Sequence, residues 1–250
     1  MKKYASVILA AGKGTRMNEG LASPIPKVMF KMNGKPVIYW SVRLIQEASI
    51  NKIVLIVGYK KDMVEDYFGN KVSYAIQKKQ LGTGHAVMMA ESALKDKAEN
   101  IIVFYGDNPL YKPETVRKLI ALYEKEKPTV AMLSVIFNDP NYWAFGRILR
   151  DPNGEVIGIK EHKDCSEEEK KIKESNPGFY IFQAKWLWEN LQKIENNNIQ
   201  KEYYLTDIIE LAKTQEKHII AMPVSEESEA LGINTPEQLK QAEEVIRKRK

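Results

Sequence analysis

The chain has 250 residues, 44% hydrophobic and 28% charged, which is typical of globular proteins and excludes disordered, collagen-like and coiled-coil classes. The first apolar run, residues 4–12, is far shorter than the roughly 20 residues that span a bilayer and leads into a glycine-rich loop rather than a cleavage site. We therefore expect a cytoplasmic protein without a membrane span. A single cysteine, Cys165, and three dispersed histidines exclude an internal disulfide and a structural zinc site.

The net charge of +5 is concentrated near the start of the chain. Residues 1–35 hold seven Lys and Arg side chains against one acid, Glu19, so the rest of the chain is nearly neutral. Positive charge around one loop suits a small polyanion better than a nucleic acid, which needs a longer stripe of phosphate contacts. The basic end, residues 247–250, is the alternative nucleic-acid patch, but cations at the carboxyl end of a helix explain it more simply.

Short, continuous, β-branched segments predict strands that are buried on both faces. They are residues 6–10, 53–57, 101–105 and 130–136. Helical patterns lie between them: one opens at Pro36, one covers residues 85–94 and one opens at Pro113. This alternation predicts an α/β fold with a mostly parallel sheet and helices on both faces, and ligands at the carboxyl ends of the strands.

The pattern changes after residue 139. Residues 146–150 and 155–160 flank the turn sequence Asp-Pro-Asn-Gly and predict a hairpin. Residues 166–175 open with a capping-box sequence and predict a solvated helix. Further strands are expected at 178–183 and 219–224, a helix at 206–213 and a closing helix from Thr235. No repeat or linker divides the chain, so we expect one domain over residues 1–250.

The loop after the first predicted strand has the composition of a polyphosphate site. Its small residues let backbone N–H groups approach a phosphate, and Lys13 and Arg16 add positive charge. The spacing fits neither the dinucleotide fingerprint, which would need glycine where Met17 stands, nor the Walker loop.

The complete string over residues 9–17, followed by Pro26-Lys27, resembles the nucleotidyltransferases that join nucleoside triphosphates to sugar 1-phosphates. Within them it is most similar to the uridylyltransferase domain of bacterial N-acetylglucosamine-1-phosphate uridylyltransferases, without their hexapeptide-repeat domain. The other shared motifs are Gln77 with residues 80–86, and residues 105–107, 145–148, 161–164, 176 with 178, 202–207 and 232–234. The resemblance implies a Rossmann-like mixed sheet, with residues 1–138 mainly binding nucleotide, 139–234 mainly binding sugar phosphate and 235–250 forming a closing helix.

The resemblance also implies roles for individual residues. Arg16, Lys13 and Lys27 would be the catalytic cations on the phosphates. The other residues of the nucleotide site would be Leu9, Ala10, Ala11, Gly12, Gly14, Thr15, Gln77, Gly82 and Thr83, with Gln77 and Gly82 reading the base. The sugar would contact Tyr105, Gly146, Glu161, Asn176, Tyr204 and Thr206. For His85 we expect packing at a helix start.

A carboxylate after a buried strand is a natural ligand for a hard divalent cation, and Asp107 follows the strand predicted at 101–105. From spacing alone, a turn-capping role for this aspartate is equally reasonable. The resemblance favours a Mg²⁺ cofactor held by Asp107 and by the amide oxygen of Asn234, with water and substrate phosphates completing the shell.

The implied reaction is attack by a sugar 1-phosphate on the α-phosphorus of UTP, most simply by N-acetylglucosamine 1-phosphate, giving a UDP-sugar and pyrophosphate. Three departures concern the acceptor side and the loop: Pro177 after Asn176, the bulky residues 143–145, and a longer loop over residues 18–24. They leave open another hexose 1-phosphate or a phosphocholine-like acceptor. Another nucleotide, CTP or dTTP, is a separate alternative. A non-catalytic nucleotide-binding regulator is a further alternative. The sequence predicts neither an oligomeric state nor a nucleic-acid or membrane partner.

Overall fold

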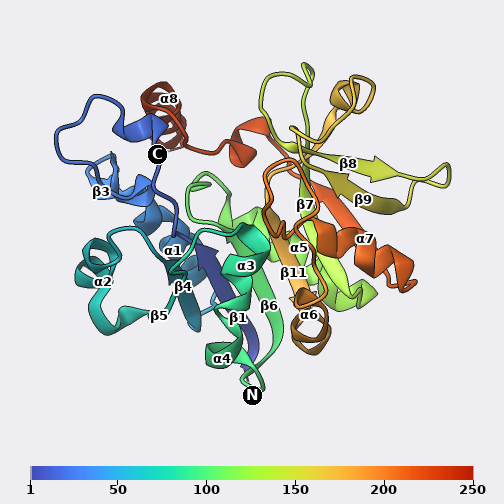
Figure 1. Cartoon of the computed structure of the whole chain (residues 1–250). Coiled ribbons are helices and arrows are strands. Elements are labelled where there is room, and N and C mark those ends of the chain that lie inside the picture. Colours follow the sequence, from blue (N-terminus) through green and yellow to red (C-terminus); the bar gives the residue numbers. More distant parts are fainter. Residues whose placement is uncertain (1, 250) are drawn as a thin grey trace.

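One ten-stranded mixed sheet runs through the molecule in a computed structural model that describes residues 2–249 (Figure 1). Its order is β5-β4-β1-β6-β11-β7-β10-β8-β9, and β12 pairs with β7. The strands are β1 Lys2–Leu9, β4 Ile53–Val57, β5 Ser73–Ile76, β6 Ala98–Tyr105, β7 Val130–Ile136, β8 Gly146–Arg150, β9 Val156–Lys160, β10 Glu174–Asn176, β11 Phe179–Gln183 and β12 Ile219–Pro223. A separate two-residue ladder joins β2 (Lys31–Met32) to β3 (Lys35–Pro36).

The first half of the sheet is parallel and most of the second half is antiparallel. Strand β1 pairs in parallel with β4 and β6, whereas β11 pairs antiparallel with β6 and β7. The central parallel strands β1, β4 and β6 have almost entirely buried centres because helices cover both faces, as the continuous apolar runs predict. The expected α/β architecture is therefore confirmed, with parallel pairing in the run β5-β4-β1-β6 and between β12 and β7.

Alternating side chains of the strands supply two core layers. On one face, Val7, Ile56 and Val103 pack with α3 (Thr83–Met88), α6 (Ala184–Leu191) and α7 (Asp207–Thr214). On the other, Ile8, Leu55 and Phe104 pack with α1 (Val37–Glu47), α2 (Asp62–Phe68) and α5 (Pro113–Glu126). The closing helix α8, Pro236–Lys248, is capped by Thr235, whose side chain accepts a hydrogen bond from the backbone N–H of Gln238.

Two local expectations are wrong. The helix expected over 85–94 is broken into α3 and α4 (Glu91–Leu94). The capping box at Ser166 forms, since Ser166 N donates to Glu169 Oε2 and Glu169 N to Ser166 Oγ, but only a 3₁₀ turn over Glu169–Lys171 follows. Residues 174–176 pair with β7 and β8 as a strand instead, so sheet pairing overrides the local helix signal.

Candidate active site

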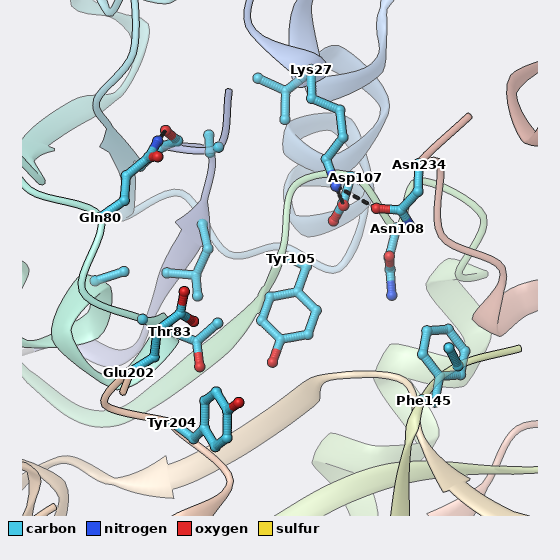
Figure 2. A pocket seen from close by; sticks show the side chains of 18 of the residues that line it. Lys27, Gln80, Thr83, Tyr105, Asp107, Asn108, Phe145, Glu202, Tyr204 and Asn234 are labelled. Carbon is cyan, nitrogen blue, oxygen red and sulfur yellow. Dashed lines mark hydrogen bonds and ion pairs between the residues drawn. The ribbon is translucent and has the colours of Figure 1, made fainter. Parts of the chain in front are cut away.

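A cavity of about 560 Å³ opens where the strand ends of the parallel half meet the second half of the chain (Figure 2). Side chains that the resemblance assigns to nucleotide, metal and sugar line it together. Of the predicted site residues it contains Leu9, Ala10, Ala11, Gly12, Arg16, Lys27, Gln77, Gly82, Thr83, Tyr105, Asp107, Glu161, Tyr204 and Asn234.

The loop that follows β1 is held by its own amide side chain. Asn18 Nδ2 donates to the carbonyl oxygens of Lys13, Gly14 and Ile25, and Asn18 Oδ1 accepts from Ile25 N. Gly14 has a φ of +67°, and a Cβ there would lie 2.6 Å from Lys27 Cβ. Glycine is thus required where the loop packs against Lys27.

Lys27 crosses the cavity and joins two distant segments. Its ammonium group forms an ion pair with the Asp107 carboxylate and donates to Asn234 Oδ1 at 2.8 Å, as Figure 2 shows. The side chains of Lys27 and Asp107 are 18% and 16% exposed, so they face the cavity without being fully desolvated.

Close backbone packing brings Asp107 to this position. Gly106, just after β6, lies so close to α1 that a Cβ would be 2.7 Å from Ile38 Cδ1, and its carbonyl oxygen accepts from Ser41 Oγ at 3.0 Å. The carbonyl oxygen of Asp107 accepts from Ile233 N at 2.9 Å. This last bond ties the segment that carries Asn234 to the end of β6.

The donor set fits a hard divalent cation. The two side-chain oxygens converge on one positive group, the Lys27 ammonium. Carboxylate and amide oxygens are ligands that Mg²⁺ accepts when water or phosphate completes the shell. Among residues 2–249, no group of three His, Cys, Asp or Glu side chains is placed to hold a metal by itself.

Gln77 and Gly82 lie together on the other side of the cavity. Gln77 is 4% exposed, and its Nε2 donates to the Gly82 carbonyl oxygen at 3.0 Å. Gly82 has a φ of +110°, and a Cβ there would lie 2.5 Å from the Tyr203 carbonyl oxygen. Thr83 Oγ1 accepts from Leu205 N at 2.9 Å, which further joins this loop to the second half of the chain.

The far end of the cavity carries the half-buried acid Glu161, and a second half-buried acid, Asp207, lies near it outside the lining. Thr206 donates to Glu161 Oε1 at 3.0 Å. Burial raises the pKa of Glu161. Burial, followed by charge repulsion from Glu161, raises the pKa of Asp207 to about 7. Tyr204 accepts at its hydroxyl from Gln200 Nε2 at 2.7 Å, and burial raises its pKa to about 12. This end therefore offers weakly charged, hydrogen-bonding groups.

Some predicted site residues lie outside the cavity lining: Lys13, Gly14, Thr15, Gly146, Asn176 and Thr206. Lys13 and Thr15 are exposed on the loop. Both ends of the Asn176 amide are engaged inside the protein, since Nδ2 donates to Tyr180 Oη at 2.6 Å and Oδ1 accepts from Gly178 N at 3.1 Å. Gly146 lies behind Glu161, with a hypothetical Cβ 3.5 Å from Glu161 Oε2.

An aromatic wall, made of Tyr142, Trp143 and Phe145, borders the cavity on the second half. Its ring centroids are 5.4 Å apart for Tyr142 and Trp143 and 6.2 Å for Trp143 and Phe145. Behind it, the guanidinium of Arg147 is fully buried. It donates to the carbonyl oxygens of Pro140 at 2.6 Å, Phe145 at 2.5 Å and Lys170 at 3.4 Å, so one side chain holds both the wall and the segment after β9.

The comparison with family models agrees with this arrangement: the model described as Nucleotidyl transferase matches residues 5–228. The chain belongs to the nucleotidyl transferase family. It is similar to the bifunctional protein GlmU of Caldanaerobacter subterraneus subsp. tengcongensis, with 45% identity over 249 residues, and to that of Acetivibrio thermocellus, with 43% identity. Both alignments cover 100% of this chain and 53% of the relative, so the chain spans about half the length of these relatives.

Solved structures share the fold of this family member. A UDP-glucose pyrophosphorylase complexed with UDP-glucose superposes with a TM-score of 0.81 at 22% identity, covering 100% of both chains. A putative glucose-1-phosphate thymidylyltransferase from Bacillus anthracis gives a TM-score of 0.78 at 21% identity, covering 98% of this chain and 95% of that one. In residues 2–249 we find no helix long and apolar enough to cross a membrane.

Sequence reasoning missed several residues that line this cavity. Those with polar side chains are Gln80, Asn108, Tyr142, Gln200, Glu202 and Gln238. Asn108 follows Asp107 directly, and Glu202 opens a motif already singled out, so adjacency to both was an available signal. Nothing in the local sequence of Gln200 or Gln238 distinguishes it from an exposed polar residue.

Proposed function

We propose that this chain transfers a uridylyl group from UTP to a sugar 1-phosphate, with N-acetylglucosamine 1-phosphate as the first acceptor to test, and releases pyrophosphate. The observation that carries the proposal is the joining of Lys27, Asp107 and Asn234 within one cavity. The 45% identity to a GlmU protein supports uridylyl transfer. In this reading the nucleotide binds mainly to residues 1–138 and the acceptor mainly to residues 139–234.

Positioning and charge stabilisation are sufficient for this chemistry. A phosphate oxygen of the acceptor attacks the α-phosphorus in line with the departing pyrophosphate, and no covalent enzyme intermediate is needed. Arg16 and Lys27 line the cavity, and in the proposed reaction their cations stabilise negative charge on the phosphoryl oxygens. A bound Mg²⁺ held by Asp107 and Asn234 would supply further positive charge to those oxygens.

The part of the cavity near Gln77 suits a pyrimidine base that carries an N–H on the edge facing this side chain. Gln77 reaches the cavity with its amide nitrogen already bonded to Gly82, which leaves the amide oxygen to accept a hydrogen bond from the base. At the other end, Glu161 and Tyr204 offer groups that can bond to sugar hydroxyls or an acetamido N–H.

A second acceptor class is favoured by the aromatic wall. Aromatic faces attract quaternary ammonium groups, and Tyr142, Trp143 and Phe145 line the acceptor half of the cavity. An alcohol phosphate such as phosphocholine is therefore the alternative acceptor, with CTP as its nucleotide.

A substrate matrix tests these proposals. UTP, CTP and dTTP are each combined with N-acetylglucosamine 1-phosphate, glucose 1-phosphate and phosphocholine, with and without Mg²⁺, and pyrophosphate release is measured. We expect the fastest release from UTP with N-acetylglucosamine 1-phosphate, and only with Mg²⁺. Fastest release from CTP with phosphocholine would support the second class, and no release from any pair would contradict both.

A further inference from the structure

His85 lies behind the base-reading residue and contacts it directly. It is on α3, and its Nδ1 is 3.0 Å from Gln77 Nε2. His85 does not line the cavity, whereas Gln77 does. Any effect of the imidazole on a bound base would therefore pass through the Gln77 side chain.

The neighbours of Gln77 determine which way its amide points. The Gly82 carbonyl oxygen, 3.0 Å from Nε2, can only accept a hydrogen bond. The nitrogen of the Gln77 amide must therefore face Gly82. Because Nδ1 of His85 contacts the same nitrogen, this ring atom must also accept, which requires a neutral imidazole with its proton on Nε2. Burial lowers the pKa of His85 and favours that neutral form.

Both amide hydrogens of Gln77 are then in use. One is donated to Gly82 and the other to His85, and among residues 2–249 no hydrogen bond reaches Gln77 Oε1. The oxygen is the part of the amide left for a ligand. If the amide were rotated by half a turn, its oxygen would face two acceptors, the Gly82 carbonyl oxygen and His85 Nδ1. These two neighbours therefore fix the orientation of the Gln77 amide.

We propose that His85 is a positioning residue for nucleobase selection: by accepting the second amide hydrogen of Gln77, it keeps Oε1 as an acceptor facing the base. Uracil and thymine offer an N–H at ring position 3, which this oxygen can accept. Cytosine has an unprotonated nitrogen at that position, so two acceptors would face each other. The inference rests on the proposed function, because it names the group that makes the nucleotide site prefer UTP over CTP.

Two variants of His85 test this role. His85→Leu replaces the imidazole with an apolar side chain of similar length that has no hydrogen-bond acceptor. His85→Asn restores an acceptor through its amide oxygen. His218→Ala is the control, because His218 is exposed just before β12, far from α3 in the sequence. For each protein, kcat/KM is measured with UTP and with CTP, and the affinity of each nucleotide is measured by calorimetry without acceptor.

We expect His85→Leu to lower the UTP to CTP ratio by about tenfold, since one hydrogen bond that holds the amide is lost. His85→Asn should recover most of the ratio, and His218→Ala should leave it unchanged. Should leucine prevent folding, His85→Ala takes its place in the same comparison. If the variant weakens UTP and CTP equally, His85 only supports the fold and the proposal is wrong.

The calorimetry separates this inference from the proposed function. A wild-type chain that releases no pyrophosphate, yet binds UTP better than CTP in a His85-dependent way, would contradict the activity and support the inference. If the wild type transfers uridylyl groups but the His85 variants leave the UTP to CTP ratio unchanged, the activity is supported and the inference is wrong.

Discussion

The ammonium group of Lys27 donates a hydrogen bond to the amide oxygen of Asn234, 207 residues further along the chain, and the same ammonium is paired with Asp107. A positive side chain thus lies between the two oxygens that the sequence nominates as metal ligands. Lys27 and a divalent cation would compete for these oxygens, and substrate phosphates offer Lys27 another partner.

Replacing Lys27 should strengthen metal binding to the nucleotide-free protein. We expect Lys27→Met to bind Mn²⁺ about tenfold or more tightly than the wild type, because charges a few ångströms apart repel by kilocalories at partly buried sites. Electron paramagnetic resonance of free Mn²⁺ measures the affinity. Lys31→Met, on the exposed end of β2, is the control. Equal affinity in the two variants would contradict competition at this site.

Arg147 should act on the acceptor half of the cavity more than on the nucleotide half. Arg147→Met removes hydrogen bonds to carbonyl oxygens in two segments. We expect KM for the acceptor to rise about tenfold, since bonds to charged groups are among the stronger ones, while KM for UTP changes less than about twofold. Steady-state kinetics with each substrate varied provides the measurement.

The same strand offers a matched control for Arg147. Arg150 also lies on β8 but forms an ion pair with Glu174, 2.7 Å away, at the surface. Arg150→Met should leave both KM values near those of the wild type. If Arg147→Met raised both KM values in the same proportion, its guanidinium would support the fold as a whole rather than the acceptor side.

Asp207 should make stability depend on pH. Its folded-state pKa is about 7, raised by burial and by Glu161, so between about pH 4 and 7 the folded chain binds more protons than the unfolded chain. Protonated Asp207 therefore stabilises the folded chain at low pH, and this contribution to the free energy of unfolding is lost as pH rises through 7. Melting temperatures from pH 5 to 8 should show Asp207→Asn gaining a few degrees over the wild type at pH 8 and less at pH 5.

An exposed aspartate is the comparison for Asp207. Asp62, on α2, has a side chain that is 79% exposed, and Asp62→Asn should shift the melting temperature equally at both pH values. Because the pKa of Glu161 is raised as well, some pH dependence should persist in Asp207→Asn. A difference from the wild type that is the same at pH 5 and pH 8 would contradict the assignment.

Alanine substitutions at Gly178 and Gly154 should distinguish the cost of backbone strain from that of side-chain overlap. Both have a φ of +82°, but a Cβ at Gly178 would overlap the Tyr105 ring, whereas nothing lies within 4 Å of one at Gly154. We expect Gly154→Ala to destabilise by about 1 kcal/mol and Gly178→Ala by more, together with a raised KM for the acceptor as Tyr105 shifts. Denaturant unfolding measures both, and equal losses would contradict the overlap.

Much of the fold could be predicted from local patterns. The strands at 53–57 and 130–136 have the predicted bounds, and Pro113 opens a helix as expected. Such signals fail where distant pairing decides, as at β10, which takes up the last two residues of the helix expected over 166–175. Arg147 was not foreseen as a buried residue because its partners are backbone carbonyls, which leave no complementary charge in the sequence.

The candidate site follows the same division. Most segments that line the cavity could be named from their motifs, since they come directly after a strand or before a helix. Which member of a segment faces the cavity could not, because it depends on strand register and on neighbours far away. Asn176 illustrates this: its amide is held by Tyr180 and Gly178, and the cavity is lined instead by residues 142–145, just before β8.

The bond from Ile233 N to the Asp107 carbonyl oxygen has a consequence for biosynthesis. Asn234 follows the last of the ten strands, β12, in the chain, so nearly the whole sheet can leave the ribosome before this amide oxygen does. A cation that needs both oxygens would therefore bind only after the sheet that supports Asp107 has formed.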